Sequence, residues 1–163
     1  MPSPVLNTLL DAGFPEGGLN YWLSSFTRGL TDELIDTAVE RFAAVPSSMT
    51  SILFEHFHGA VTRIGPTETA VPHREPGWNL LIPSVWTDPA DTGANIRWTR
   101  ETFADLRPQL ATRRWLNYLG DDQADDARRS LPSAGSHCCW LFTAARGRDR
   151  AQVHSAALRR DRE

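Results

Sequence analysis

The stretch WNLLIPSVW, Trp78–Trp86, decides the fold. Its residues are apolar at odd and even positions alike, which is typical of a strand that is covered on both faces. Pro83 lies inside this run, and because proline cannot donate a hydrogen bond to a neighbouring strand, it predicts a bend or a place at the sheet edge. The run therefore predicts a strand that packs against other elements of the same chain.

Four further segments are expected to be extended. Asn20–Phe26 is rich in aromatic residues, and Met49–Phe57 alternates apolar and polar side chains. Ala60–Ile64 continues the second segment after a glycine, and Trp115–Leu119 is a short apolar run before an acidic turn. These patterns predict strands.

Two helices are expected between these strands. Thr31 precedes acidic residues and an apolar repeat, which predicts an N-capped amphipathic helix ending near Ala44. Asp88-Pro89 supplies a second cap and a proline at the first helical position, which predicts a helix to Leu106. The order β, α, β, β, α, β predicts an α+β fold, an antiparallel sheet with helices packed on one face.

Size and charge limit the classes of function. The chain has 163 residues with a net charge of −3, which fits one domain and argues against a general binder of nucleic acid or anionic membranes. No apolar run is long enough to span a bilayer. The first residues lack the features of a signal peptide, so the expected location is the cytoplasm.

The charge divides the chain unevenly. Residues 1–127 hold nine arginines and 17 acids, a balance of −8, whereas residues 128–163 hold eight arginines and three acids, a balance of +5. We expect a leader and loop over 1–19, a partial domain over 20–127, and a disordered or poorly packed arginine-rich tail over 128–163. Since the chain contains no lysine, we hypothesise a GC-rich gene and an out-of-frame tail.

Three histidines form one candidate site. His56, His58 and His73 could ligate zinc or iron, with Glu55 or Glu68 as a fourth donor, as in a small metal enzyme. The alternative is that these histidines are ordinary polar residues of a half-exposed sheet.

Tyr118 is a second candidate. A tyrosine can act as a general base when its surroundings lower its pKa, and otherwise it is a tyrosine at the core edge whose hydroxyl is hydrogen-bonded. The sequence contains none of the common phosphate-binding, nucleophile-elbow or metal-binding motifs. The residues alone do not define a complete active site.

Three strings carry a resemblance to a known family. EHFHGAV at 55–61, AVPHR at 70–74 and WLNYLGD at 115–121 resemble, in order and spacing, the substrate domain of the berberine-bridge-enzyme-like FAD-linked oxidases of the vanillyl-alcohol-oxidase superfamily. With the segments around them, the resemblance covers roughly residues 20–127.

The resemblance implies a substrate-binding domain that covers the ring of an FAD held by another domain, in enzymes that take a hydride from a small-molecule substrate. It implies that Tyr118 is the catalytic base and contacts the cofactor, and that Asn117 lies on the flavin side. It further implies that Glu55 and Phe57 line the substrate cavity. It places Asn79 on the substrate side. The carboxylate that some members use as the base should fall near Asn79 or Leu80, neither of which can usefully accept a proton, so Tyr118 is the remaining candidate for the base.

The family's FAD-binding domain has no counterpart in this sequence. We therefore expect a fragment of an FAD-dependent oxidoreductase that does not retain FAD alone and is inactive without a separate flavin-binding domain. The sheet face that would meet that domain is expected to be an exposed apolar patch. A non-catalytic α+β module that dimerises through this face is the remaining alternative.

Overall fold

The computed structural model describes residues 15–65, 68–69, 71 and 73–123, and the single residues Val5, Thr8 and Ser130. Most of the predicted leader and, apart from Ser130, all of the arginine-rich tail at 128–163 lie outside the described residues.

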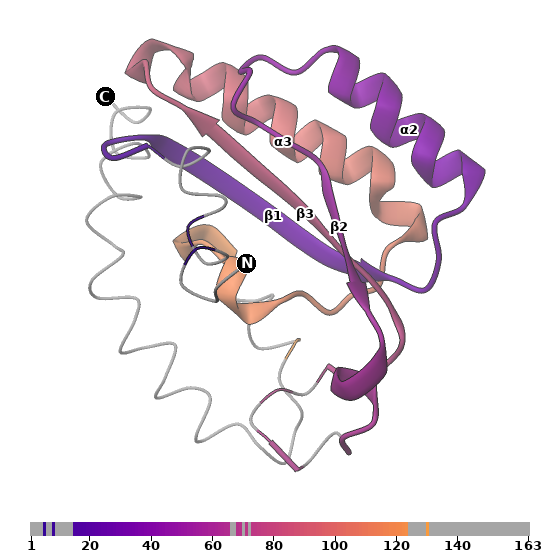
Figure 1. Ribbon diagram of the computed structural model, residues 1–163. Helices are drawn as coiled ribbons and strands as arrows, with labels where there is room; N and C mark the ends of the chain where they lie inside the picture. The colour runs from indigo at the N-terminus through magenta and orange to yellow at the C-terminus, as the bar shows by residue number, and fades with distance from the viewer. Residues whose placement is uncertain are drawn as a thin grey trace.

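Three antiparallel strands form the sheet, in the order β1-β3-β2 (Figure 1). They are β1 (Leu19–Thr27), β2 (Leu53–Phe57) and β3 (Gly77–Trp86). The β1–β3 register runs from Leu19 opposite Trp86 to Thr27 opposite Trp78. The predicted covered strand is thus the centre of the sheet, and the predicted α+β fold is confirmed.

Pro83 marks neither a bend nor an edge, because β3 is continuous and central. The N–H of Val85 donates to Thr50 Oγ1 on the β2 side, so position 83, two residues away, faces the same side. The last β2 pair is Leu53 opposite Leu81, and Pro83 lies beyond it. A proline is tolerated at this position because no ladder hydrogen bond is required there.

Gly77 lets β1 and β3 approach closely at the other end of their ladder. A Cβ at this position would stand 2.5 Å from the carbonyl oxygen of Thr27, which is closer than carbon and oxygen can pack. Its φ of +154° also favours glycine. The start of β3 therefore depends on the absence of a side chain.

Both long helices lie on one side of the sheet (Figure 1). Helix α2 (Asp32–Ala43) begins after Thr31, whose hydroxyl oxygen accepts a hydrogen bond from the N–H of Leu34. Helix α3 (Thr92–Leu106) follows the 3₁₀ turn η3 (Pro89–Asp91) and packs against β1 and β3. The cap predicted for α2 is confirmed, whereas Asp88 caps η3 and α3 itself begins only at Thr92, after that turn.

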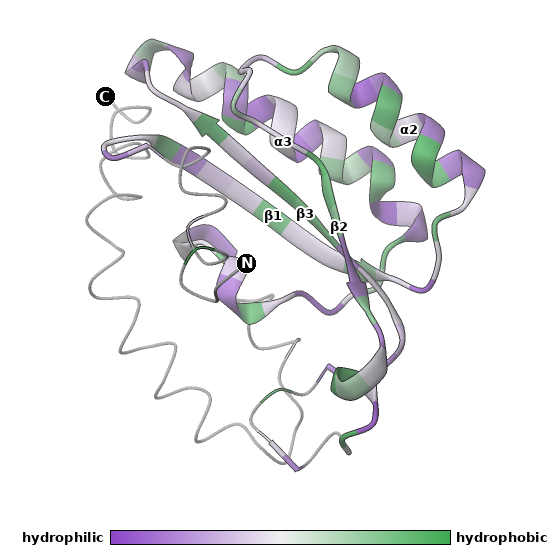
Figure 2. Ribbon diagram, in the orientation of Figure 1, coloured by the Kyte–Doolittle hydropathy of each residue, from purple (hydrophilic) through white to green (hydrophobic). Residues whose placement is uncertain are grey.

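The core lies between the sheet and these helices. Figure 2 shows the hydrophobic colouring running along β3, which is buried on both faces. Only Leu34 and Ala38 of the apolar repeat in α2 are buried. The outer side of α2 exposes Ile35, Val39 and Phe42.

Two predicted strands are wrong. After Gly59, which has a φ of +72°, the chain forms the 3₁₀ turn η2 (Gly59–Thr62) instead of continuing β2. The segment 115–119 contains the 3₁₀ turn η5 (Leu116–Tyr118), because its aromatic side chains pack against the face of the sheet and its backbone does not join the sheet edge. The first four residues of the predicted strand 49–57 are also not part of β2.

Candidate functional site

The sheet has a second face, turned away from α2 and α3, that we call the helix-free face. Side chains alternate along a strand, and residues paired across strands share a face. Because Leu80 and Ile82 belong to the core beneath the helices, their neighbours in β3 point the other way. The paired register assigns these residues to the helix-free face: Trp22, Ser24 and Phe26 of β1, Asn79, Leu81, Pro83 and Val85 of β3, and Leu53, Glu55 and Phe57 of β2.

Three of the predicted site residues meet on this face. The Tyr118 hydroxyl donates to Glu55 Oε1 at 2.9 Å, and Asn79 Nδ2 donates to Glu55 Oε2 at 2.6 Å. Adjacent strands provide Glu55 and Asn79, which are direct partners in the register, and η5 provides Tyr118 from 63 residues away in the sequence. One carboxylate therefore joins a phenol and an amide.

The surroundings of Tyr118 oppose loss of its proton. Burial, followed by the hydrogen bond and the negative charge of Glu55, raises the pKa of Tyr118 from 10.0 to about 12. Its ring also packs edge-on against Trp22, with ring centroids 5.7 Å apart. At neutral pH Tyr118 is therefore a hydrogen-bond donor whose direction is fixed by Glu55.

Two polar atoms on the same face are buried without a hydrogen-bond partner among the described residues. They are Ser24 Oγ and Asn79 Oδ1, and both residues are 0% exposed. Buried polar atoms of this kind cost stability unless they are satisfied. A partner from outside the described residues, or a bound molecule, would satisfy them.

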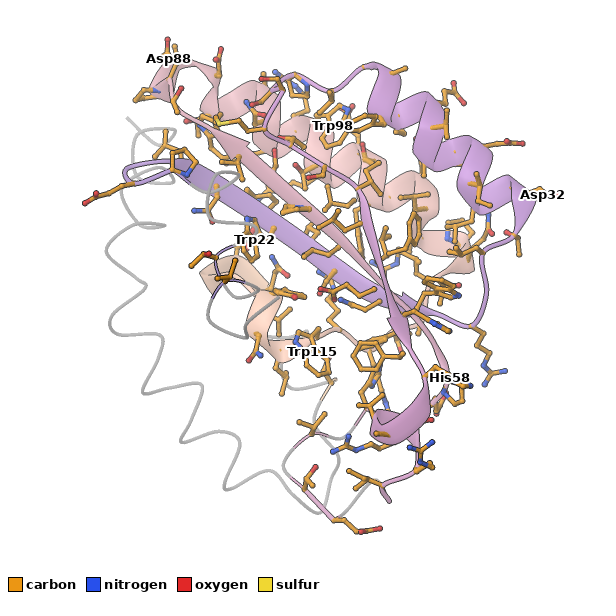
Figure 3. The ribbon with its side chains drawn as sticks, viewed as in Figure 1. Trp22, Asp32, His58, Asp88, Trp98 and Trp115 are labelled. Atoms are coloured by element: carbon orange, nitrogen blue, oxygen red, sulfur yellow. The ribbon has the colours of Figure 1, made fainter. Side chains whose placement is uncertain are left out.

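Aromatic rings cluster at the end of the helix-free face where β1 and β2 end and β3 begins. Trp115 packs edge-on against Phe26 and Phe57, with centroids 6.1 Å and 5.3 Å away, and His73 packs against Phe26. Figure 3 shows Trp22 and Trp115 on the side of the sheet opposite Trp98, which lies among the helices. Phe57 is thus a member of an aromatic cluster, and its role in lining a substrate cavity stays a prediction.

Sequence reasoning missed the residues that hold this cluster together. The sequence patterns predict strands around Ser24, Phe26 and Trp115, and neither they nor the resemblance gives these residues a role in the site. The register of β1 would have revealed Ser24 and Phe26, since both share a face with Asn79. Nothing in the local pattern around Trp115 indicates that it folds over the sheet.

Asn117 does not join the site. It is exposed and has no hydrogen bond with another described residue. Its neighbour Tyr118 turns toward the sheet because η5 is a 3₁₀ turn, which sends adjacent side chains in different directions. The flavin-side role of Asn117 stays a prediction.

The three histidines are not brought together. His56 stacks on Trp78, with centroids 4.4 Å apart, on the helix side of the sheet, and His58 stacks on His56. His73 lies against Phe26 on the opposite face. Among the described residues no group of three histidine, cysteine or acidic side chains could hold a metal ion, so the metal-enzyme alternative receives no support.

The expected open apolar patch is also not found on the helix-free face. Phe26, Leu81 and Val85 are 7%, 4% and 2% exposed. Glu55, Phe57 and Tyr118 of the site remain half-exposed, and Leu53 of β2 on the same face is 37% exposed. Among the described residues, Ile35, Val39 and Phe42 of α2 account for half of the exposed large apolar side chains.

None of the helices within the described ranges combines the length and apolar character that crossing a membrane requires.

Comparison with known proteins finds solved structures of similar fold, but no protein family or curated protein of similar sequence. No family model and no curated protein matches this chain. Three solved structures illustrate the likeness. CrmK, a flavoenzyme of caerulomycin biosynthesis, is 24% identical with a TM-score of 0.59 over 71% of this chain and 26% of its own. The glycopeptide hexose oxidase DBV29 is 20% identical with a TM-score of 0.57, over 65% and 24%. BBE-like 1 from Physcomitrella patens is 15% identical with a TM-score of 0.56, over 85% and 28%.

The aligned part is about a quarter of each of these proteins, and at these identities the likeness concerns the fold alone. The described part of this chain has the architecture of one portion of these proteins, BBE-like 1 among them.

Proposed function

We propose that this chain provides the substrate side of an FAD-dependent oxidoreductase and is inactive until another domain supplies the flavin. The observation that carries the proposal is the carboxylate of Glu55, held by Asn79 and bonded to the hydroxyl of Tyr118 on the helix-free face. The fold shared with about a quarter of several oxidases supports it.

The residues of the face fit one part of FAD. Half-exposed aromatic side chains, Trp22, Trp115 and Tyr118, suit contact with the flat isoalloxazine ring. The unsatisfied oxygen atoms of Ser24 and Asn79 are polar groups near it that a ligand could engage. The phosphates and the adenine would be held by the other domain, because the sequence has no phosphate-cradling glycine loop.

When bound beside Trp22, Trp115 and Tyr118, the flavin would supply the acceptor for a hydride from a substrate carbon. The protein then has to take a proton from the substrate's hydroxyl or amine. Since the pKa of Tyr118 is about 12, we assign it a relay: its oxygen accepts the substrate's proton while its own proton passes to the carboxylate of Glu55. Asn79 keeps that carboxylate in place.

Binding of the flavin ring tests the proposal on the whole chain. Riboflavin and FAD are titrated separately against the purified protein, and quenching of flavin fluorescence is followed. We expect weak binding with dissociation constants that agree within about twofold, because only the shared ring would be recognised. Trp115→Leu should weaken both.

The matched control is Val39→Ser, a substitution of an apolar residue that is 65% exposed on α2. It should leave flavin binding unchanged. Absence of any quenching, or quenching that Trp115→Leu and Val39→Ser affect equally, would overturn the proposal.

A further inference from the structure

A cavity of about 710 Å³ lies where β1 ends and β3 begins. Its apolar walls come from Phe26, Trp78 and Leu110, together with two prolines of the adjoining loops. Flat rings and prolines leave a space suited to a flat apolar group. The Tyr118–Glu55–Asn79 group does not line this cavity, so the inference below does not depend on the function proposed above.

The charge at the cavity differs from that of the chain. Arg28 and Arg113 contribute two positive charges and Glu75 one negative charge, which gives +1 at the lining of a protein whose net charge is −3. Among the described residues, the guanidinium group of neither arginine has an ion pair or a hydrogen bond. By contrast, Arg41 pairs with Asp105 elsewhere in the fold.

His73 adds no charge to this lining. Burial, and then the positive charge of Arg113, lowers the pKa of His73 to about 4, so its ring is neutral at pH 7. The cavity thus combines an apolar floor with two unpaired cations at its rim.

We propose that this cavity binds a small organic anion with a flat apolar body, whose anionic group is held by Arg28 and Arg113. Guanidinium groups form paired, charge-assisted hydrogen bonds with carboxylates and phosphates, and both arginines are exposed and free to turn toward a ligand. The body of the ligand lies against Phe26 and His73, which pack against each other on the helix-free face. Phe26 also contacts Trp115, so the ligand would rest against a ring of the aromatic cluster.

Benzoate and its uncharged counterpart benzamide are the probes. Each is titrated into the full chain, and the amide signals of Gly29 and Gly77, two glycines of the lining, are followed by NMR. We expect benzoate to shift these signals, and benzamide to bind at least about fivefold more weakly because it lacks the charge. Binding of benzoate should weaken as salt is added.

Single substitutions test which side chains hold the anionic group of the ligand. Arg28→Gln and Arg113→Gln should each weaken benzoate binding by about fivefold. Glu75→Gln should tighten it by about twofold, because it removes the lining's only described carboxylate. Arg97→Gln is the matched control, an exposed arginine of α3 that does not line the cavity, and should change nothing.

The inference is overturned if benzoate does not shift the lining signals, if benzamide binds as tightly as benzoate, or if neither arginine variant differs from Arg97→Gln. The comparison of the two probes uses the unaltered chain, so it decides the matter even where a variant fails to fold.

Discussion

Replacing Glu55 by glutamine should make Tyr118 easier to ionise. The pKa of Tyr118 is about 12, so about one tenth of its side chains are ionised at roughly pH 11, against about nine tenths for a tyrosine at the ordinary value of 10. Burial is the largest cause of the raised pKa of Tyr118, and it persists in the variant. The negative charge of Glu55 is removed in the variant, and its hydrogen bond with Tyr118 is removed or weakened. A fall of about one unit would bring the ionised fraction to about one half.

The chain contains two tyrosines, which makes the assay direct. In a Tyr21→Phe background, the tyrosinate absorbance reports Tyr118 alone. Asp122→Asn in the same background is the matched control, because Asp122 bonds Tyr21 and not Tyr118. It should leave the titration of Tyr118 unchanged.

The raised pKa of Tyr118 makes the folding stability depend on pH, and this limits the pH range in which the titration can be done. Because the pKa of Tyr118 is higher in the folded chain than in the unfolded one, this contribution to folding is complete below about pH 10 and is lost as the pH rises through about 12. Circular dichroism at each pH therefore has to show that the chain is still folded. The reasoning is refuted if Tyr118 of the folded parent is mostly ionised at roughly pH 11, or if Glu55→Gln leaves the ionised fraction at one tenth.

Two further predictions concern the free energy of unfolding, measured by urea denaturation. Leu34→Ala should lower it by about 2–5 kcal/mol, because Leu34 is 0% exposed, while Val39→Ala on the outer side of the same helix should change it by less than about 0.5 kcal/mol; equal losses would contradict the assigned faces of α2. Gly77→Ala should lower the free energy of unfolding by about 1–3 kcal/mol, because the added Cβ would meet the backbone of β1. Gly29→Ala is the control, since a Cβ at that position meets nothing within 4 Å. A Gly77 variant as stable as the Gly29 variant would contradict the close approach of β1 and β3.

The sequence predicted the elements whose signals are local. The cap at Thr31 and the doubly apolar run at 78–86 became the expected helix end and strand, whereas Asp88-Pro89 starts the 3₁₀ turn that precedes α3. The errors at 60–64 and 115–119 have one cause: a short apolar run has the same composition whether it pairs in a sheet or folds over one. Tertiary packing, through Trp115 on Phe26 and Phe57, decided the second case.

The site was only partly accessible to sequence reasoning. The resemblance selected Tyr118, Glu55 and Asn79, and these three do meet. That one carboxylate would join the other two depends on the register between β2 and β3, which short strands do not specify in the sequence. The arginine pair at the cavity could not be foreseen either, since Arg28 and Arg113 are 85 residues apart in the sequence and carry no motif.

The strand order has a consequence for how this chain is made. Because β3 lies between β1 and β2, the first strand has no ladder partner among the described residues until the third has been synthesised, and the pair Leu19–Trp86 closes a loop of 67 residues. Closing such loops costs chain entropy before any contact repays it. On the ribosome, α2 and β2 would emerge while the aromatic strand β1 still waits, unpaired, for its partner. A holding chaperone that shields β1 during that interval would therefore protect the nascent chain from aggregation more than one that acts after Trp86 has emerged.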